Sequence, residues 1–237
     1  MSARNLFIAF FTIGIFSGCD VLSQLPTIPG QNTVTEAEAG QGVKEALSQG
    51  LVNAVLQLNK QDGFYADALY KVLLPPDAKK IENTLRSVGM GSMVDKAILQ
   101  INRGAEDAVG AAKPIFVDAI KSMTLTDALG LVKNGDTSIT HFFRSKTTEQ
   151  LTAAFLPIIK ASLEKTEATK YYGDMINTYN KLPTTFKKLN PDLAGYVTAK
   201  ANEALFNLIS KEELNIRNNF AARSSEILKK VFGNIIK

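Results

Sequence analysis

Residues 35–58 read TEAEAGQGVKEALSQGLVNAVLQL, and this stretch decides the fold class. Thr35 and Glu38 have the spacing of a capping box, in which a hydroxyl and a carboxylate bond free N–H groups of a helix's first turn. Behind that cap, apolar residues recur every three or four positions, at Val43, Leu47, Leu51, Ala54, Val55 and Leu58. This spacing places them on one face and predicts an amphipathic helix, which Gly63 closes.

Helix signals continue along the rest of the chain. Pro75-Pro76-Asp77 ends one predicted helix and opens another that stops near Gly89. Residues 93–123 predict a long helix, or a pair of helices, with a kink at Pro114. Further helix starts are predicted by capping patterns at residues 124–127, 147–150 and 210–213 and by Asn190-Pro191. Because no stretch alternates as a strand would and no linker follows residue 35, we predict one all-α domain with about eight or nine helices and no sheet.

The composition is that of an ordinary globular protein. The chain has 237 residues, of which 45% are hydrophobic and 21% charged, and this excludes a disordered, collagen-like or polytopic membrane protein. A single Cys excludes an intramolecular disulfide, and one Cys with one His leaves too few ligands for a zinc site. We therefore expect no metal and no cofactor. The net charge is +4, but the basic residues form no dense stripe with interleaved aromatics, so we expect no nucleic-acid partner.

The first residues have the pattern of an export signal. Arg4 precedes an apolar stretch from Leu6 to Phe16, which as a helix would rise about 16 Å, half the thickness of a bilayer's hydrocarbon core. Ser17-Gly18-Cys19 follows, and the segment resembles a bacterial lipoprotein signal with its lipobox, although Phe16 stands where Leu is usual. The resemblance implies cleavage before Cys19 and acylation of that residue, as in a palmitate-bearing lipoprotein. A plain secretory signal with an incidental Cys is the alternative.

We accordingly expect a signal peptide at residues 1–18, a lipid-anchored tether at 19–35 and a helical domain at 36–237. Two prolines and a glycine, at residues 26, 29 and 30, suit a partly extended tether. The protein would then lie in the bacterial cell envelope, anchored to a membrane by its lipid and facing the periplasm. The outer membrane is favoured, but Asp20 resembles an inner-membrane retention signal and keeps the inner membrane open.

Seven blocks of the chain are similar, in order, to consecutive blocks of one bacterial family. They are GVKEAL at 42–47, NRGAE at 102–106, MTLTDA at 123–128, THFFR at 140–144, YVT at 196–198, EELNIR at 212–217 and ARSSEILKKVFG at 222–233. Over about residues 40–233 the chain resembles DUF4197, a bacterial domain family of unknown function whose members are exported. The family usually has Ala at Gly104, Tyr at Phe142 and Pro after Asn218. The resemblance implies an exported helical domain and no particular activity.

Polar residues in these blocks are the candidates for a site: Asn102, Arg103, Glu106, Asp127, Arg144, Glu213 and Arg217. Arg103 and Glu106 are three residues apart and Glu213 and Arg217 four apart, so each pair shares a helix face. Their neighbours are apolar or small, where an isolated charge is costly. We interpret the pairs as internal ion pairs that fix helix register. The alternatives are a carboxylate pair for glycosidase-like catalysis and recognition of a polar ligand by the arginines.

No residue is predicted to be catalytic. His141 has no second His and no nearby Cys to work with, and it is interpreted as a surface residue. The favoured function is therefore a lipid-anchored, non-catalytic envelope protein with an interaction or structural role. One alternative is a binding module for a lipid or other amphiphile, which a closed pocket of about 300 Å³ or more would favour. The other is a hydrolase, which would need two carboxylates facing one cleft.

Overall fold

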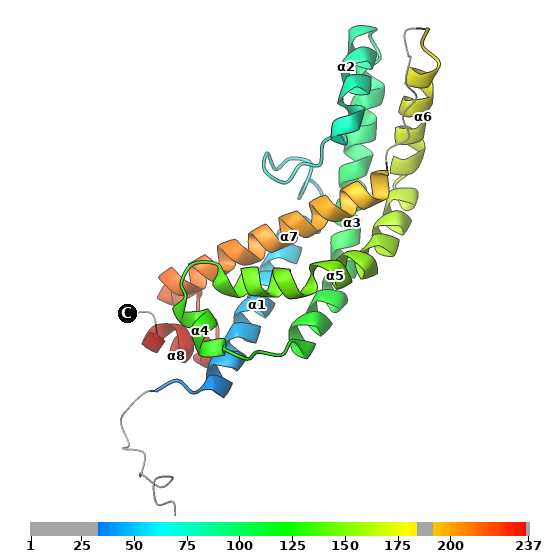
Figure 1. The fold of residues 1–237 in the computed structure, drawn as a ribbon. Coiled ribbons are helices and arrows are strands. Elements are labelled where there is room, and N and C mark those ends of the chain that lie inside the picture. The colour runs from blue at the N-terminus through cyan, green and yellow to red at the C-terminus, as the bar shows by residue number, and fades with distance from the viewer. Residues whose placement is uncertain (1–32, 184–191, 236–237) are drawn as a thin grey trace, which may run out of the picture. The chain divides into compact units, whose positions relative to one another are not determined.

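The structure, a computed structural model, describes residues 33–183 and 192–235 as one compact, mostly helical unit with no strand in that part of the chain. The α-helices of Figure 1 are α1 (Glu36–Leu58), α2 (Lys79–Ser87), α3 (Gly91–Ser122), α4 (Ala128–Lys133), α5 (Ser138–Lys165), α6 (Ala168–Asn180), α7 (Leu193–Asn218) and α8 (Glu226–Ile235). Two short 3₁₀ helices, η1 (Pro76–Ala78) and η2 (Phe220–Ala222), precede α2 and α8. The predicted all-α fold is therefore confirmed.

The core lies between four long helices, α1, α3, α5 and α7, which pack on one another. Phe116 of α3, Phe143 of α5 and Phe206 of α7 are all buried. The ring of Phe206 lies 6.0 Å from that of Phe116 and 5.8 Å from that of Phe143, centroid to centroid, in tilted and edge-on arrangements. Such geometry adds to the stabilisation that burial of the rings provides, so Phe206 of α7 contacts aromatic residues of both α3 and α5 in the core.

Close approach of α1 to its neighbours depends on glycine. A Cβ at Gly50 would lie 3.2 Å from the Cα of Ile209 on α7, and a Cβ at Gly42 would lie 2.8 Å from a methyl group of Val231 on α8. At Gly50 the obstacle is backbone, which cannot rotate away. Gly50 is therefore a contact point of two helix backbones.

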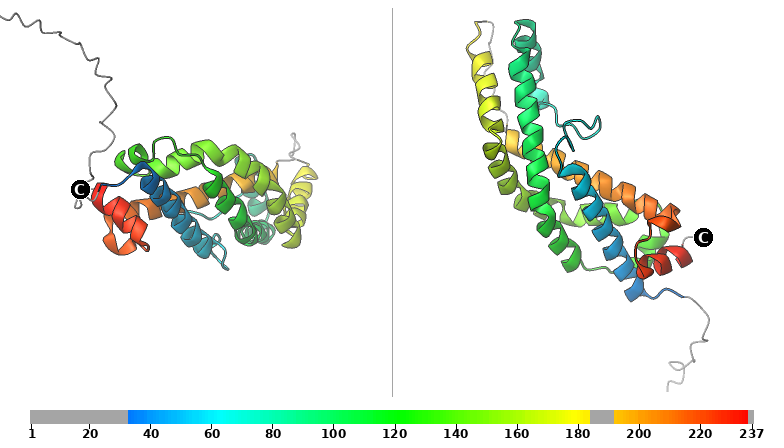
Figure 2. Two further views of the ribbon diagram at one scale, coloured as in Figure 1. Left: turned by 90° about the horizontal axis from the view of Figure 1, so that it is seen from below. Right: turned by 180° about the vertical axis from the view of Figure 1, so that it is seen from behind.

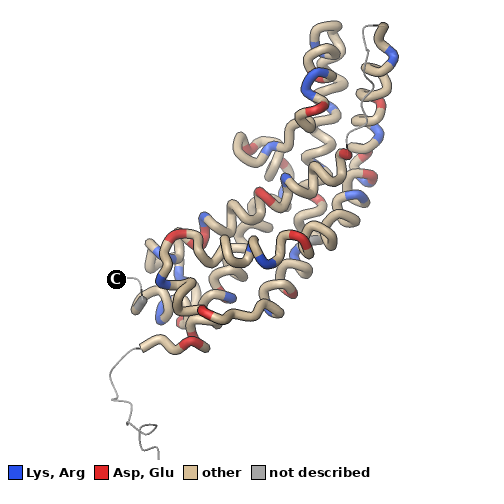
Figure 3. Tube along the Cα trace, viewed as in Figure 1, with Lys and Arg blue, Asp and Glu red and all other residues tan. Residues whose placement is uncertain are grey.

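The shorter helices gather at the two ends of this core. α2 and α6 lie against α3 and against one another, while α4 and α8 lie against α1 and against one another (Figures 1 and 2). Lys and Arg are interspersed with Asp and Glu along the described helices (Figure 3). Only a few charged side chains are buried there: Glu106, Glu213, Arg217 and Arg223.

Some predicted helix ends are confirmed. Thr35 caps α1, since its hydroxyl accepts from the Glu38 N–H over 3.2 Å and its own N–H donates to the Glu38 carboxylate over 3.0 Å. Asp192 caps α7 by accepting from the Gly195 N–H over 3.0 Å. The predicted start at residues 190–191 lies outside the described residues.

The capping patterns at residues 147–150 and 210–213 were wrongly predicted to start helices, because both lie inside helices, α5 and α7. In α5 the hydroxyl of Thr147 donates to the Phe143 carbonyl over 2.6 Å, the bond that such a residue makes when a helix continues through it. The pattern at 124–127 does precede α4. There, however, the cap is Asp127, which accepts from the Gly130 N–H over 2.8 Å.

Residues 59–75 form no helix, although the sequence predicted one ending at Pro75. The Asp67 carboxylate accepts from the N–H groups of Leu69 and Tyr70 over 2.8 and 3.2 Å, which favours a turn over a helix. Side chains of α3 bond other backbone groups of the segment, as described below. We call residues 59–75 the α1–α2 loop.

Candidate functional site

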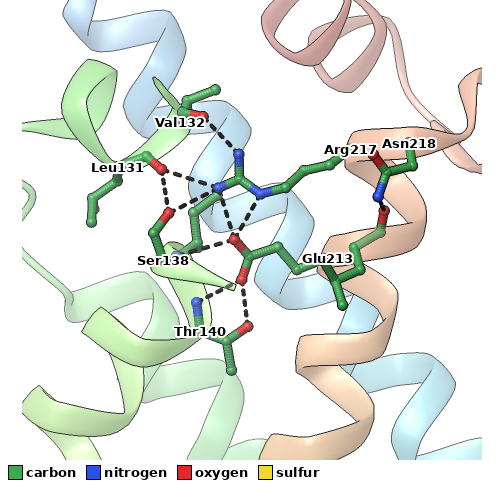
Figure 4. A network of polar contacts seen from close by, with 9 residues as sticks. Leu131, Val132, Ser138, Thr140, Glu213, Arg217 and Asn218 are labelled. Atoms are coloured by element: carbon green, nitrogen blue, oxygen red, sulfur yellow. Dashed lines mark hydrogen bonds and ion pairs between the residues drawn. The ribbon is translucent and has the colours of Figure 1, made fainter. Parts of the chain in front are cut away.

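Glu213 and Arg217, which the sequence places on one helix face, form an ion pair inside the protein (Figure 4). Only 2% of Glu213 and 4% of Arg217 is exposed. Arg217 donates from Nη2 and Nε to Oε1 of Glu213 over 2.8 and 3.0 Å. Its guanidinium also lies 5.6 Å from the ring centroid of Phe232 on α8. Both charges are therefore removed from water, and both must be balanced by protein groups.

Glu213 is balanced by the beginning of α5. Its carboxylate accepts from the N–H groups of Ile139 and Thr140 over 3.1 and 2.8 Å, and from the Thr140 hydroxyl over 2.7 Å. The first N–H groups of a helix have no partner within that helix, and they carry the positive end of its dipole. The carboxylate thus satisfies this end of α5 and fixes it against α7.

Arg217 is balanced by the end of α4. It donates to the carbonyl oxygens of Val132 and Leu131 over 2.6 and 3.0 Å, and to the Ser138 hydroxyl over 3.0 Å. These carbonyls belong to the last turn of a helix, where a cation is favourable. One ion pair therefore holds the end of α4, the start of α5 and the turn between them (Figure 4).

Arg223 closes the same region, and the sequence analysis missed it. It is buried, and it donates to the carbonyl oxygens of Ile216 and Arg217 over 2.9 and 3.0 Å, so it caps the end of α7. Burial lowers the pKa of Arg223. Arg223 lies in the block at 222–233 that resembles the family, and this could have marked it as a candidate residue. Its spacing from other polar residues did not indicate that it would bond the carbonyl groups at the end of α7.

Asn102 on α3 holds the α1–α2 loop from inside. It is fully buried, and its amide exchanges two hydrogen bonds with the backbone of Val72, from N–H to Oδ1 and from Nδ2 to the carbonyl, both over 2.8 Å. Nδ2 also donates to the Ile98 carbonyl over 2.7 Å. The side chain replaces the backbone partner that Val72 would have in regular structure.

Glu106, one turn further along α3, holds the beginning of the same loop. Its Oε1 accepts from the N–H groups of Phe64 and Tyr65 over 3.1 and 3.2 Å. Arg103 donates to Oε2 of Glu106 over 2.6 Å and to Asp62 of the loop over 2.7 Å. The bond to Glu106, and then that to Asp62, raises the pKa of Arg103. The second predicted pair therefore fastens the loop to α3.

The other two candidates lie apart from both pairs. Asp127 is the exposed cap of α4, and Arg144 is exposed on α5 with its guanidinium 5.5 Å from the ring centroid of Phe206. The candidates thus occupy separate places in the fold. Glu106 and Glu213 use their oxygens for structural hydrogen bonds in different regions, so they do not form the pair facing one cleft that a hydrolase would need.

Both fastened elements border one groove along α7. At its first part, a cavity of about 210 Å³ lies between the α1–α2 loop and α7. The loop contributes Leu69, Tyr70, Lys71 and Leu73, and α7 contributes Tyr196, Lys200, Glu203, Ala204 and Asn207. Leu69 and Leu73 are 64% and 52% exposed, which is unusual for large apolar side chains. The loop that Asn102 and Glu106 hold therefore forms one wall.

The second part of the groove lies between α5 and α7. This cavity, of about 220 Å³, is lined by Thr140, His141 and Arg144 from the first turns of α5 and by Glu203, Phe206, Asn207 and Ser210 from α7. Glu203 and Asn207 line both cavities, so the two adjoin. We call them together the α7 groove. The wall on this side is the first turn of α5, which Glu213 holds.

Hydrogen bonds inside the α7 groove fix its polar groups. Lys211 donates from Nζ to the Tyr70 hydroxyl over 2.9 Å, and that hydroxyl donates to Oδ1 of Asn207 over 2.8 Å. The Asn207 oxygen thus accepts from Tyr70, and the amide can donate from Nδ2 to a ligand. Glu203 pairs with Lys200 over 2.8 Å, and this bond raises the pKa of Lys200.

The Tyr196 hydroxyl, at the rim, has its pKa raised chiefly by burial. At neutral pH the Tyr196 hydroxyl therefore keeps its proton, and it lies in the same lining as the Lys200 ammonium.

Three larger hollows, of about 690, 620 and 480 Å³, are open to solvent and do not have the closed form that an enclosed acyl chain needs. The first lies between α5, α6 and the start of α7 and adjoins residues that the structure does not describe. The second lies between α1 and the end of α3. The third is lined by residues of the α1–α2 loop alone. The α7 groove lies between two elements, the α1–α2 loop and the start of α5, that buried side chains hold.

The ion pair of Glu213 and Arg217 predicts a stability effect. Glu213→Gln or Arg217→Met leaves a buried charge without its partner, which typically costs about 3–5 kcal/mol. We expect each variant of the full chain to melt at a markedly lower temperature when followed by circular dichroism. The double variant should recover only part of the loss, because the backbone groups of α4 and α5 stay unpaired.

The matched control is Glu167→Gln with Lys170→Met, an i,i+3 pair whose side chains are 55% and 63% exposed. Its loss should leave the melting temperature almost unchanged, because exposed ion pairs are screened by water and contribute little to stability. Wild-type stability in both single variants of the buried pair would contradict the structural role.

Comparisons with known proteins identify the family alone. Among the described residues there is no group of three or more metal-ligating side chains, and none of the helices there is long and apolar enough to cross a membrane. Neither curated proteins nor solved structures gave a match. The family model for DUF4197, described as a protein of unknown function, matches residues 33–233. These residues include both buried pairs and the whole α7 groove, and the chain belongs to the DUF4197 family.

Proposed function

We propose that the protein is a lipid-anchored, non-catalytic binding protein of the bacterial cell envelope, and that the α7 groove is its binding surface. One observation carries the proposal: two separate buried polar clusters each hold one wall of the same groove. Asn102 and Glu106 hold the α1–α2 loop, and Glu213 holds the start of α5. Burying such groups costs free energy unless they are fully bonded, so a groove with two walls fixed in this way suits a preformed site.

The groups that line the groove support binding over catalysis. Its one carboxylate, Glu203, is exposed and paired with Lys200, and the groove's hydroxyl, amide and guanidinium groups are donors suited to holding a ligand. Acid–base catalysis would favour a carboxyl group with a raised pKa beside a second titratable group. In the part of the chain that the structure describes, the groove's carboxylate is instead bound to the Lys200 ammonium, while His141 lines the second cavity.

Binding of an amphiphile is the second candidate function. Leu69 and Leu73 expose apolar surface beside Lys71, as the head and tail of an anionic amphiphile would require. The adjoining cavities of about 210 and 220 Å³ are smaller than the pockets that usually enclose such ligands. The groove therefore favours a ligand that lies along the surface.

The anchor belongs to the same proposal. Cys19 lies outside the described residues, and its role is supported by the sequence Ser17-Gly18-Cys19 behind an apolar stretch. Each buried CH₂ of an acyl chain contributes about 0.8 kcal/mol to membrane binding. One acyl chain binds a membrane reversibly, and stable anchoring needs a second chain or another attachment. Two or three acyl chains at Cys19 would keep the helical body at the membrane, facing the periplasm, with the outer membrane favoured over the inner.

Changing Cys19→Ala should abolish acylation and leave the precursor uncleaved, because the thiol that receives the lipid is gone. Metabolic labelling with an alkyne fatty acid, followed by gel analysis, measures both effects. The wild-type chain is the control. Because Cys19 is the single Cys of the chain, no other thiol can take up the label as a thioether. Equal labelling of the variant would contradict the anchor.

A photo-reactive benzoyl-phenylalanine at Leu73 should form a protein adduct in intact bacterial cells, because Leu73 borders the groove. The same group at Val88, an exposed apolar residue after α2, is the control and should form none. Arg144→Gln should remove the Leu73 adduct, while Lys146→Gln, which takes one charge from the same helix, should leave it. No adduct from Leu73, or equal adducts from both positions, would contradict the proposed binding surface.

A further inference from the structure

We infer that the occupant of the α7 groove is an extended peptide segment of a partner protein, with an apolar side chain in the first cavity and an acidic side chain in the second. The inference rests on the proposed function and specifies the ligand of the same groove. It combines the charge, the apolar surface and the spacing of the two cavities.

The charge around the groove favours an acidic ligand. Three cations line it, Lys71, Arg144 and Lys200, against one carboxylate, Glu203, and a fourth, Lys211, bonds the Tyr70 hydroxyl of the lining. Lys200 and Glu203 pair with one another, and within the described residues the other three cations make no ion pair. Asp95, whose pKa is lowered by its bond to Arg86 and in smaller part by the charge of Lys71, does not line the groove. The lining side chains therefore carry an excess of positive charge, which a ligand of opposite charge complements.

Arg144 is the group best placed to receive an acidic side chain. Its guanidinium lies 5.5 Å from the Phe206 ring centroid, within the range of a cation–π contact, and is exposed at the cavity. The Asn207 amide lines the same cavity with Nδ2 as its free donor, and Ser210 adds a hydroxyl. A carboxylate bound there can receive a forked pair of bonds from the arginine and another from the amide.

The first cavity offers apolar contact instead. Leu69 and Leu73 expose 64% and 52% of their surface at its rim, and Tyr196 and Ala204 lie on the α7 side. An apolar side chain inserted between them removes apolar surface of both leucines from water, which favours binding in proportion to the area buried.

The spacing of the cavities fits an extended chain. On α7 the first is lined between residues 196 and 207 and the second between 203 and 210, so their midpoints are about five residues apart, a rise of ~7.5 Å. In an extended peptide, side chains i and i+2 point to the same side about 6.6 Å apart. Each cavity, of about 210 and 220 Å³, suits one side chain. An apolar and an acidic residue two positions apart therefore match both.

The test measures fluorescence anisotropy of labelled peptides with the full lipidated chain in dodecyl maltoside. The probes are fluorescein-Gly-Gly-Leu-Ser-Glu-Gly-Gly-amide, the same peptide with Glu and Leu exchanged, and versions with Gln for Glu or Ser for Leu. We expect one of the two acidic orders to bind and both altered versions to bind about tenfold more weakly or worse, since a hydrogen bond to a charged group contributes about 1.5–3 kcal/mol.

The decisive comparison is a double-mutant cycle between protein and peptide. Arg144→Gln should weaken the acidic peptide about tenfold and leave the Gln peptide unchanged, because the two changes remove the same contact. Lys146→Gln is the control: it removes one charge from α5 two residues further on, about 200° around the helix, and should change neither affinity by more than about twofold. Equal weakening by both variants, or no coupling between Arg144 and the peptide Glu, would overturn the inference.

Inorganic phosphate and dioctanoyl phosphatidylglycerol serve as competitors. If either competitor displaces the peptide at a concentration below the Kd of the peptide, the competitor binds more tightly than the peptide does. That result would assign the groove to a phosphate or a lipid headgroup and would overturn the inference. If the Leu73 adduct forms in cells but no acidic peptide binds, the binding function stands and the acidic-peptide assignment fails. If the adduct is absent as well, both fail.

Discussion

The buried ion pair of Glu213 and Arg217 is the contact on which the arrangement around α7 depends. Each member also bonds backbone groups that a helix end leaves without a partner, Glu213 at the start of α5 and Arg217 at the end of α4. The carboxylate of Glu213 meets the positive end of one helix dipole, and the guanidinium of Arg217 meets the negative end of another. The two buried charges and the two helix ends, each costly to bury alone, therefore stabilise one another. This explains how two charges can be buried next to a short helix and a tight turn. Together with Phe143 and Phe206, the pair fixes α5 to α7.

The same physical device appears at the α1–α2 loop, where Asn102 and Glu106 of α3 supply the partners that the loop backbone lacks. An irregular segment can lie against a core only if its N–H and C=O groups are bonded. Both clusters therefore act by positioning elements, and the elements they position are the two walls that face α7. Of the polar residues that the sequence singles out, Asn102, Glu106 and Glu213 are thus one step removed from the groove they shape, whereas Arg144 lines it. The groups available to a ligand, such as Arg144 and Asn207, are ordinary exposed side chains.

The fold class and the two pairs could be predicted because their signals are local: a cap, a helical period, and spacings of three and four residues. The α1–α2 loop could not, because its conformation is set by side chains of α3 that lie about 30–40 residues further along the chain. The groove was equally out of reach, since the Tyr70–Asn207 bond joins residues 137 positions apart. The patterns at 147–150 and 210–213 failed for a related reason. A capping pattern is informative only where the chain leaves the helix, and in α5 and α7 it continues.

The central claim is that the buried polar clusters hold the walls of the α7 groove, and amide hydrogen exchange of an Asn102→Leu variant tests it most directly. The account predicts that the Val72 amide and its neighbours in the α1–α2 loop exchange much faster than in the wild type, since the Val72 N–H loses its acceptor. The Ile139 and Thr140 amides, held by Glu213, should keep their wild-type protection. Unchanged exchange at Val72, or acceleration spread evenly over α5 and the loop, would contradict the claim.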